Sequence, residues 1–155
     1  KIKIICSGKV SSGFSIVRNL AIGADVCNAA RAMLFALGCV QALKCNTNRC
    51  PTGITTQDKE LQKGLDVDSK AVRVFQYHND TTRTAVEIMG AIGVKNNASL
   101  QPYHVNRRIN LEKTVTYDDL FPLPEAGALI KGQASADLQN HWDRSMREHK
   151  RRAAA

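Results

Sequence analysis

Three cysteines with a regular spacing are the residues of this chain best suited to chemistry. Cys39, Cys45 and Cys50 follow the pattern C-x5-C-x4-C. On one continuous helix, positions six residues apart point about 240° apart, so Cys39 and Cys45 would face different ways. Their thiolates can converge only if the helix ends near Leu43 and the chain curls back. Asparagines and Pro51 favour such a turn, so the spacing predicts a soft iron–sulfur or zinc centre.

Other interpretations of the three cysteines stay open. Free cysteines are often buried, so all three can also be packed thiols without a ligand. Zinc is a weaker alternative, because the nearest histidine, His78, lies far along the sequence on an expected helix. A cluster held by three thiolates needs no fourth protein ligand, and Lys44 and Arg49 would offset its negative charge.

A second group of residues is suited to binding phosphate. Ser7-Gly8-Lys9 follows one expected strand, and Ala29-Ala30-Arg31 follows the next. In parallel α/β folds, ligands bind at the carboxyl ends of the strands. A glycine lets the backbone approach a phosphate, helix N-termini point N–H groups at it, and arginine adds a fixed positive fork. The pattern predicts an anion site, although a plain turn beside a surface arginine explains it about equally well.

The elements that must position these residues alternate between strand and helix. Apolar residues predict strands over 2–6 and 24–28, a helix from Phe14 to Ala21 that Gly23 stops, and a helix from Ala29 to about Leu43 that is buried. Short connections between such elements are typical of a parallel sheet. Two strands cannot form that sheet alone, so we expect the other strands in a missing part of the chain or in another chain.

A loop and a long helix are expected next. Turn residues fill the stretch from Cys45 to about Val67. Asp68 can cap a helix that runs to about Ile92 and ends at Gly93. One face of this helix is expected to carry four apolar residues, Val72, Phe75, Val86 and Met89.

Three further segments complete the expected organisation. A short helix is expected over 99–107, and a turn of helix over 116–120 precedes two prolines. The tail from Asn140 mixes both signs of charge and ends in Arg151-Arg152-Ala153-Ala154-Ala155, so we expect a solvated helix or disorder.

Composition narrows the class of protein. The chain has 155 residues, a formal net charge of +8 and 5% aromatic residues. Nucleic-acid binding is not expected, because no interleaved aromatics or helix-turn-helix pattern accompany the basic excess. No apolar run is long enough to span a membrane, and neither a signal segment nor an initial methionine is present. We therefore expect a piece of a longer cytoplasmic protein, and the odd count of five cysteines fits a reducing compartment.

Three stretches resemble one enzyme family. Residues 3–10, 21–33 and 45–58 are similar to the C-terminal part of the FMN-binding glutamate synthase family, and the cysteine stretch with its trailing Thr-Gly-x-x-x-Gln-Asp is the most specific. The resemblance covers roughly residues 1–130. It implies an α/β fold, namely the C-terminal portion of a (β/α)8 TIM-type FMN barrel, then an iron–sulfur loop and a helical extension. The implied ranges are 1–44 for the last two βα units, 45–67 for the cluster loop and 68–155 for the extension with its basic tail.

The resemblance also implies cofactors and their ligands. The FMN phosphate would lie at Ser7, Gly8, Lys9, Ala29, Ala30 and Arg31. Cys39, Cys45 and Cys50 would hold an iron–sulfur cluster, which in this family is typically [3Fe-4S]. Cys6 stands where most members have a small residue. The earlier barrel strands, which carry the residues that hold 2-oxoglutarate, are absent, so no catalytic residue is assigned.

The implied activity is that of glutamate synthase, an oxidoreductase that forms L-glutamate from 2-oxoglutarate and ammonia by reductive amination. A glutaminase domain or subunit would release the ammonia from glutamine. Electrons would come from ferredoxin or from an NAD(P)H-oxidising subunit. Two non-enzymatic alternatives remain: a truncated, non-catalytic remnant, and a structural metal-binding module built on the three cysteines.

Overall fold

The computed structural model describes residues 2–153, which divide into two compact units. The first unit ends at Tyr117 and the second begins at Asp118. Both expected cofactor sites belong to the first unit. The expected ranges 1–44 and 68–155 extend slightly beyond the described residues, because Lys1 and Ala154-Ala155 lie outside them.

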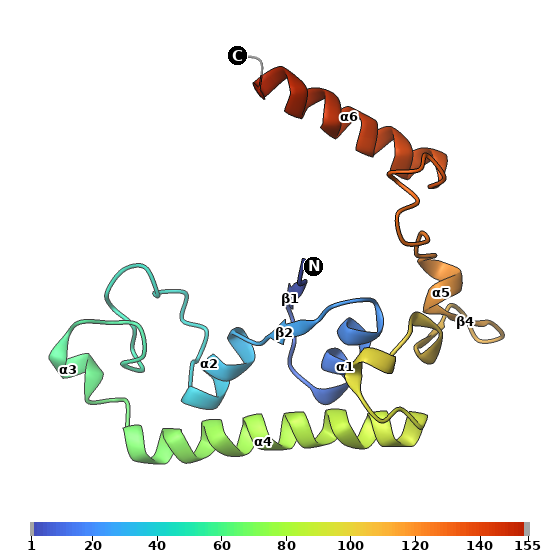
Figure 1. Cartoon of the computed structure of the whole chain (residues 1–155). Coiled ribbons are helices and arrows are strands. Elements are labelled where there is room, and N and C mark those ends of the chain that lie inside the picture. Colours follow the sequence, from blue (N-terminus) through green and yellow to red (C-terminus); the bar gives the residue numbers. More distant parts are fainter. Residues whose placement is uncertain (1, 154–155) are drawn as a thin grey trace. The chain divides into compact units, whose positions relative to one another are not determined.

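The first unit opens with the expected β-α-β-α order (Figure 1). Its elements are β1 (Ile5–Ser7), α1 (Gly13–Ala21), β2 (Val26–Asn28) and α2 (Arg31–Leu37). The two strands pair in parallel, with Ile5 opposite Val26, Cys6 opposite Cys27 and Ser7 opposite Asn28. The α/β class is confirmed. Residues 2–153 contain no barrel, because no further strand joins this two-stranded sheet.

Local sequence explains where α1 begins and ends. The Ser12 side chain accepts a hydrogen bond from the backbone N–H of Ser15, which caps the start of the helix. The helix ends at Ala21, and Gly23 follows with a φ of +108°, so the expected stop is confirmed.

Helix α2 is shorter than the sequence predicts. The expected helix continues from Ala29 to about Leu43, whereas α2 ends at Leu37. Gly38 takes a φ of +101° there, a left-handed conformation that commonly terminates helices and suits glycine. The expected burial is also wrong, since α2 contains no fully buried residue within the described structure. The chain after Gly38 is therefore a loop rather than a helix.

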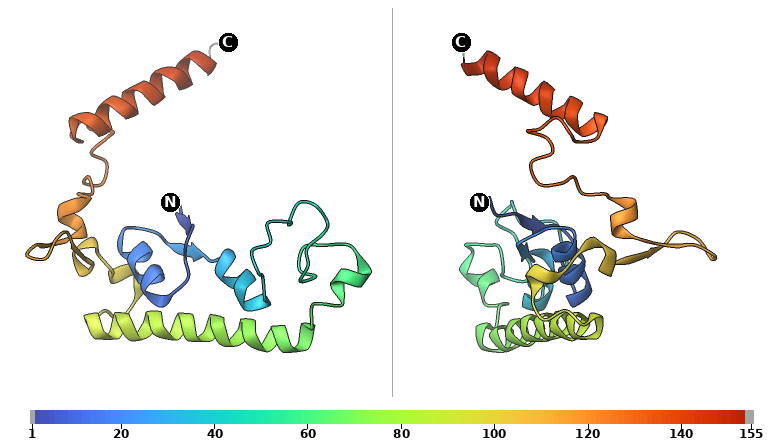
Figure 2. Two further views of the ribbon diagram at one scale, coloured as in Figure 1. Left: turned by 180° about the vertical axis from the view of Figure 1, so that it is seen from behind. Right: turned by 45° about the vertical axis from the view of Figure 1, so that its right-hand side comes forward.

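The long helix α4 (Val67–Ile92) runs beside α1 and α2 in both views (Figures 1 and 2). The expected cap Asp68 is wrong by two residues, because the Asp66 side chain accepts the hydrogen bond from the Ser69 backbone N–H. The expected end is confirmed, since Gly93 follows the helix with a φ of +83°.

Small residues decide which face of α4 is buried. A Cβ atom at Gly13 of α1 would lie 2.5 Å from the backbone nitrogen of Ala85, so the two helices approach closely there. The core cluster consists of Val17, Ala21, Ala85, Leu100 and Val105. Met89 packs against this core as expected. The other three residues of the expected face are exposed, namely Val72, Phe75 and Val86. The buried face of α4 is therefore the one with Ala85, because large side chains there would prevent the close backbone contact with α1.

Short elements replace the helix expected over 99–107. They are the 3-10 helices η1 (Asn97–Ser99) and η2 (Pro102–His104) and the antiparallel strands β3 (Asn106–Arg108) and β4 (Thr114–Thr116). A longer helix would place Pro102 in its interior, where the ring clashes with the preceding turn. The turn of helix over 116–120 is confirmed as α5 (Tyr117–Leu120). The loop expected up to residue 67 contains a short helix, α3 (Lys59–Gln62).

The second unit contains α6 (Ala136–Ala153). Of the two expectations for the tail, the solvated helix is the one confirmed up to residue 153, since no residue of α6 is fully buried in the described structure. Within residues 2–153, every helix is too short or too polar to cross a membrane.

Candidate functional site

The structure brings the two halves of the expected anion site together. Ser7 and Asn28 are register partners at the carboxyl ends of β1 and β2, so the segments 7–9 and 29–31 leave the sheet from neighbouring strands. Five of the six expected residues are exposed, namely Ser7, Gly8, Lys9, Ala30 and Arg31, and Ala29 is half-buried. Asn28 belongs to the same group. The sequence placed Asn28 at the end of the expected second strand but did not include it among the expected phosphate-binding residues.

The backbone after β1 is open on one side. Gly8 and Lys9 have φ angles of +97° and +55°. No atom outside the adjacent residues lies within 4 Å of the position that a Gly8 Cβ would take. A ligand can therefore approach the main chain at Gly8, with Lys9 next to it and Arg31 at the first turn of α2.

The three cysteines line one pocket. Cys39, Cys45 and Cys50 share it with apolar side chains and with Lys44. Cys50 is buried, Cys39 is half-buried and Cys45 is exposed. The early end of α2 and a turn in which Thr47 donates twice to the Lys44 carbonyl bring the chain back on itself. This is the reversal that the cysteine spacing required.

The three sulfur atoms do not surround a single point. Among residues 2–153, no three His, Cys, Asp or Glu side chains come together closely enough to hold one metal ion. The thiolates of an iron–sulfur cluster each bind a different iron, so they must line one pocket without meeting at one atom. The described residues therefore contain no assembled site for a metal ion or a cluster.

Hydrogen-bond donors lie beside two of the three sulfurs. The Gln41 backbone N–H donates to Cys39 Sγ over 3.5 Å, and the Thr52 hydroxyl lies 3.4 Å from Cys50 Sγ. Hydrogen bonds from Thr52 and Thr55 lower the pKa of Cys50 to about 6. Cys50 is therefore mainly a thiolate at neutral pH, which is the form that binds metals.

Strained backbone gathers at the two candidate sites. Among residues 2–153, the non-glycine residues with positive φ are Lys9, Gln41, Leu43 and Asn48, at +55°, +56°, +55° and +61°. A left-handed conformation costs an L-residue about 1–2 kcal/mol. Lys9 follows the tip of β1, and the other three lie between Cys39 and Cys50. Such conformations persist only where the surrounding structure holds them, and they cluster at ligand sites.

The Thr-Gly-x-x-x-Gln-Asp stretch fixes the cysteine loop to α3. A Cβ atom at Gly53 would lie 2.5 Å from the Leu61 carbonyl oxygen, so only glycine fits there. The Asp58 side chain caps α3 by accepting from the Glu60 backbone N–H over 2.9 Å. The Gln62 side chain donates to the main chain of the loop, at the carbonyl of residue 56, over 2.8 Å. The sequence showed this motif to be specific but did not show what it does.

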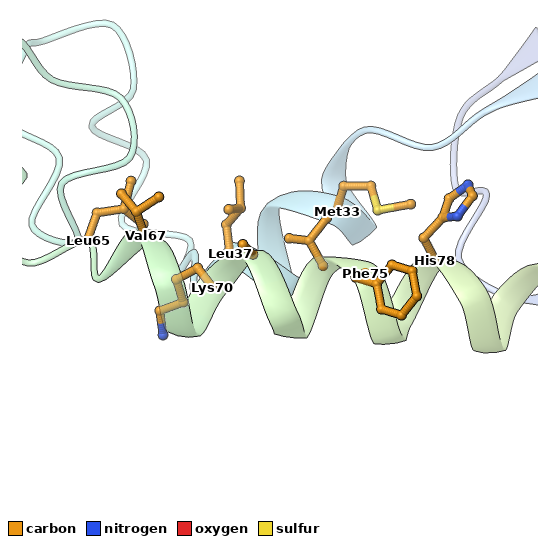
Figure 3. A pocket seen from close by; sticks show the side chains of 9 residues that line it. Met33, Leu37, Leu65, Val67, Lys70, Phe75 and His78 are labelled. Atoms are coloured by element: carbon orange, nitrogen blue, oxygen red, sulfur yellow. The ribbon is translucent and has the colours of Figure 1, made fainter.

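A larger cavity lies apart from the cysteines. It has a volume of about 550 Å³ and lies between α2 and α4, where Met33 and Leu37 lie near Phe75 and His78 (Figure 3). Its lining is mostly apolar and contains none of the three cysteines. His78, the nearest histidine considered as a zinc ligand, lines this cavity and is not part of the cysteine pocket.

Comparison with known proteins identifies the family. Residues 2–58 of this chain form an α/β unit with an open strand tip and a three-cysteine loop. Residues 1–95 match the model for the conserved region in glutamate synthase, so the chain belongs to the glutamate synthase family. The resemblance seen in the sequence is confirmed.

Several relatives are similar to the chain. It is 37% identical over 120 residues to the glutamate synthase large subunit-like protein YerD of Bacillus subtilis. The aligned stretch covers 77% of this chain and 23% of YerD. It is 36% identical over 101 residues to the archaeal glutamate synthase [NADPH] of Methanocaldococcus jannaschii, covering 65% of this chain and 20% of that protein. The chain thus spans less than a quarter of these relatives. No solved structure matches significantly.

Proposed function

We propose that this chain is the part of a glutamate synthase that holds an iron–sulfur cluster and one edge of an FMN site. The complete protein would form L-glutamate from 2-oxoglutarate and ammonia, with the ammonia released from glutamine by a glutaminase domain or subunit. Bound FMN and a [3Fe-4S] cluster supply the electron transfer for this reductive amination. Family membership supports the reaction class.

The observation that carries the proposal is the placement of the strained backbone. Four left-handed non-glycine residues occur at the strand tip and in the cysteine loop, which are the two places where the family resemblance expects cofactors. Strain of this kind costs stability, so a bound ligand gives it a physical reason.

Cys39, Cys45 and Cys50 are the proposed cluster ligands. Hydrogen bonds to Cys39 Sγ and Cys50 Sγ would stabilise their negative charge, and Lys44 in the pocket lining would offset part of it. The pocket that the three cysteines line together with other side chains has a volume of about 20 Å³, close to the room that one water molecule needs. A bound cluster would need more room than this arrangement of the loop leaves.

The strand tips are the proposed phosphate edge. Gly8 leaves room for a phosphate beside the main chain, Ser7 offers a hydroxyl, and Lys9 and Arg31 supply positive charge. Ala29 and Ala30 follow β2, and their side chains are too small to block a ligand from the main chain there. Asn28, as the register partner of Ser7, offers an amide at the same edge.

The complete protein would continue the small sheet into a (β/α)8 barrel. Apolar residues of the strands and their flanks are left exposed in this chain, with Ile5 at 62% and Val26 at 50% of their full exposure. Further barrel strands would cover them. The β1-α1-β2-α2 segment would be the last two βα units, and the residues that hold 2-oxoglutarate would lie on the other strands.

Anaerobic reconstitution with iron and sulfide tests the cluster. We expect broad visible absorbance and about three irons per chain, because three thiolates hold a [3Fe-4S] centre. Single substitutions Cys39→Ser, Cys45→Ser and Cys50→Ser should each abolish stable iron binding. Cys6→Ser and Cys27→Ser are matched controls on the sheet and should retain the iron.

The main alternative is a structural metal-binding module in a non-catalytic remnant. It is favoured by the small sheet, which holds only two strands within residues 2–153. Stoichiometric zinc without acid-labile sulfide in the reconstituted chain would support this alternative and contradict the cluster.

A further inference from the structure

Cys6 and Cys27 lie directly opposite each other in the sheet. They are register partners on the parallel strands β1 and β2, so their side chains project from the same face. Adjacent strands are about 4.7–4.9 Å apart, which falls inside the Cα separation of about 4.4–6.8 Å found in disulfides. Both cysteines are free and half-buried. Neither belongs to the three-cysteine pocket.

The thiol of Cys27 faces α1 and is close to Cys6. Its Sγ lies 3.9 Å from the Ile16 carbonyl oxygen, which the thiol can donate to. Burial raises the pKa of Cys27, and the charge of the neighbouring Cys6 raises it further. The register pairing places the two side chains next to each other on this face of the sheet.

A buried amide group points to chemistry at this pair. Asn19 is only 4% exposed, and its Nδ2 has no hydrogen-bond partner among residues 2–153. Its Oδ1 accepts from the Arg18 guanidinium at 3.3 and 3.4 Å, which fixes the orientation of the amide. The Asn19 side chain lowers the pKa of Cys27, against the larger effect of burial, which raises it. An unpaired buried N–H favours a negative charge near it, so it would stabilise a thiolate formed at this pair.

We propose that Cys6 and Cys27 form a reversible cross-strand disulfide by exchange with a low-molecular-weight disulfide such as oxidised glutathione. The Cys6 thiolate attacks one sulfur of oxidised glutathione, whose S–S bond breaks and releases one glutathione thiolate. The Cys27 thiolate then attacks the Cys6 sulfur of the mixed disulfide and releases the second. The two protons lost by the cysteines are taken up by the two glutathione thiolates. The cysteine pair is oxidised, and one glutathione disulfide is reduced to two thiols.

The disulfide joins the strand tips of the candidate phosphate edge. Ser7 and Asn28 each follow one of the bonded cysteines, so the bond fixes the spacing of β1 and β2 next to them. Both exchange steps run backwards when reduced glutathione is in excess, so the bond is reversible by the thiol pool.

Tryptic mapping tests the disulfide, because cleavage after lysine and arginine puts the five cysteines on five different peptides. After exchange with oxidised glutathione and alkylation of free thiols, we expect peptides 4–9 and 19–31 to appear joined. The joined species should disappear on reduction with dithiothreitol and should fall as the ratio of reduced to oxidised glutathione rises. In Cys27→Ser, Cys6 should instead carry glutathione. The exposed Cys45 reports whether exchange has occurred. Glutathione on Cys45 without any joined 4–9 and 19–31 peptides would overturn the proposal, as would separate glutathione adducts on Cys6 and Cys27.

Discussion

Asn48 closes the cysteine loop on Thr56. The backbone carbonyl of Asn48 accepts a hydrogen bond from the Thr56 hydroxyl over 2.7 Å, and its side-chain Oδ1 accepts from the same hydroxyl over 3.2 Å and from the Gln57 backbone N–H. Asn48 has a φ of +61°, and asparagine tolerates this conformation better than most residues. Cys50 lies inside the segment that these bonds close, so its position depends on them.

Replacing Asn48 should open this loop. Asn48→Ala removes the acceptor of the Gln57 N–H and places alanine at a positive φ. Loss of this exposed hydrogen bond costs about 0.5–1.5 kcal/mol, which corresponds to roughly 2- to 13-fold faster hydrogen exchange of the Gln57 amide. Hydrogen exchange followed by mass spectrometry or NMR measures the exchange rate of the Gln57 amide directly.

Two further variants separate the causes. Asn48→Gly loses the same acceptor but keeps the left-handed backbone, so it should destabilise the loop less than Asn48→Ala by roughly 1 kcal/mol. Asn46→Ala changes an exposed neighbour and should leave the Gln57 amide protected. Unchanged exchange at Gln57 in Asn48→Ala would show that the closure does not hold the loop.

Gly53 should tolerate no side chain. In Gly53→Ala, the new Cβ would lie 2.5 Å from the Leu61 carbonyl oxygen and 3.1 Å from the Gln62 Cα, and neither backbone atom can turn away. We expect α3 to separate from the loop, with faster amide exchange in α3 and reduced iron retention after reconstitution.

Gly93→Ala is the matched control for Gly53→Ala. Gly93 also has a positive φ, +83°, but no atom lies within 4 Å of the position of its Cβ. This variant should cost only the backbone strain of about 1–2 kcal/mol and should keep the iron. Equal effects of the two substitutions would mean that strain, rather than contact with α3, makes glycine necessary at residue 53.

Periodicity and glycines predicted the regular elements well, but not every boundary or face. The strand-helix order and the end of α4 at Gly93 follow from local signals that the structure confirms. The end of α2 was missed because the apolar pattern continues through Gly38, while the backbone turns left-handed there. The buried face of α4 was missed because the contact of Gly13 with Ala85 depends on long-range packing of small residues.

The sequence selected the candidate site residues by residue type. The structure adds the register of the strands and the hydrogen bonds of the loop, which residue type does not determine. The register that puts Asn28 opposite Ser7 is a property of the sheet. The bonds of Asn48 to Thr56 join residues eight apart through a loop of irregular backbone. No periodic pattern marks such a loop, so its hydrogen bonds are visible only in three dimensions.

Arg31→Ala should weaken FMN binding in the complete protein. A charge-assisted hydrogen bond to phosphate contributes about 1.5–3 kcal/mol, so we expect the dissociation constant for FMN to rise roughly ten- to a hundredfold. Arg31→Lys keeps the charge but loses the planar fork. Its dissociation constant for FMN should therefore lie between those of the unchanged protein and Arg31→Ala. Arg73→Ala changes an exposed arginine of α4 outside the strand tips; it is the control and should bind FMN normally. Equal flavin affinity in Arg31→Ala and the unchanged protein would place Arg31 outside the phosphate site.

The basic residues at the cysteine pocket should speed reduction by an acidic electron carrier. Lys44 lines the pocket and Arg49 precedes Cys50, and both are exposed. Small electron carriers such as ferredoxins are generally acidic, so these charges would steer one toward the cluster. Lys63 is different, because its Nζ is paired with Glu60 at 2.6 Å.

Stopped-flow reduction of the complete protein at several salt concentrations measures this steering. The rate should fall steeply above about 0.1 M ionic strength, where the Debye length is about 10 Å. Lys44→Glu with Arg49→Glu should slow association at low salt, and the rates are compared at equal iron and flavin content, because both residues also lie beside the proposed cluster. The double substitution Lys63→Gln with Glu60→Gln removes this ion pair without changing the net charge, so it should have little effect. A rate that does not change with salt would mean that Lys44 and Arg49 only balance the charge of the cluster.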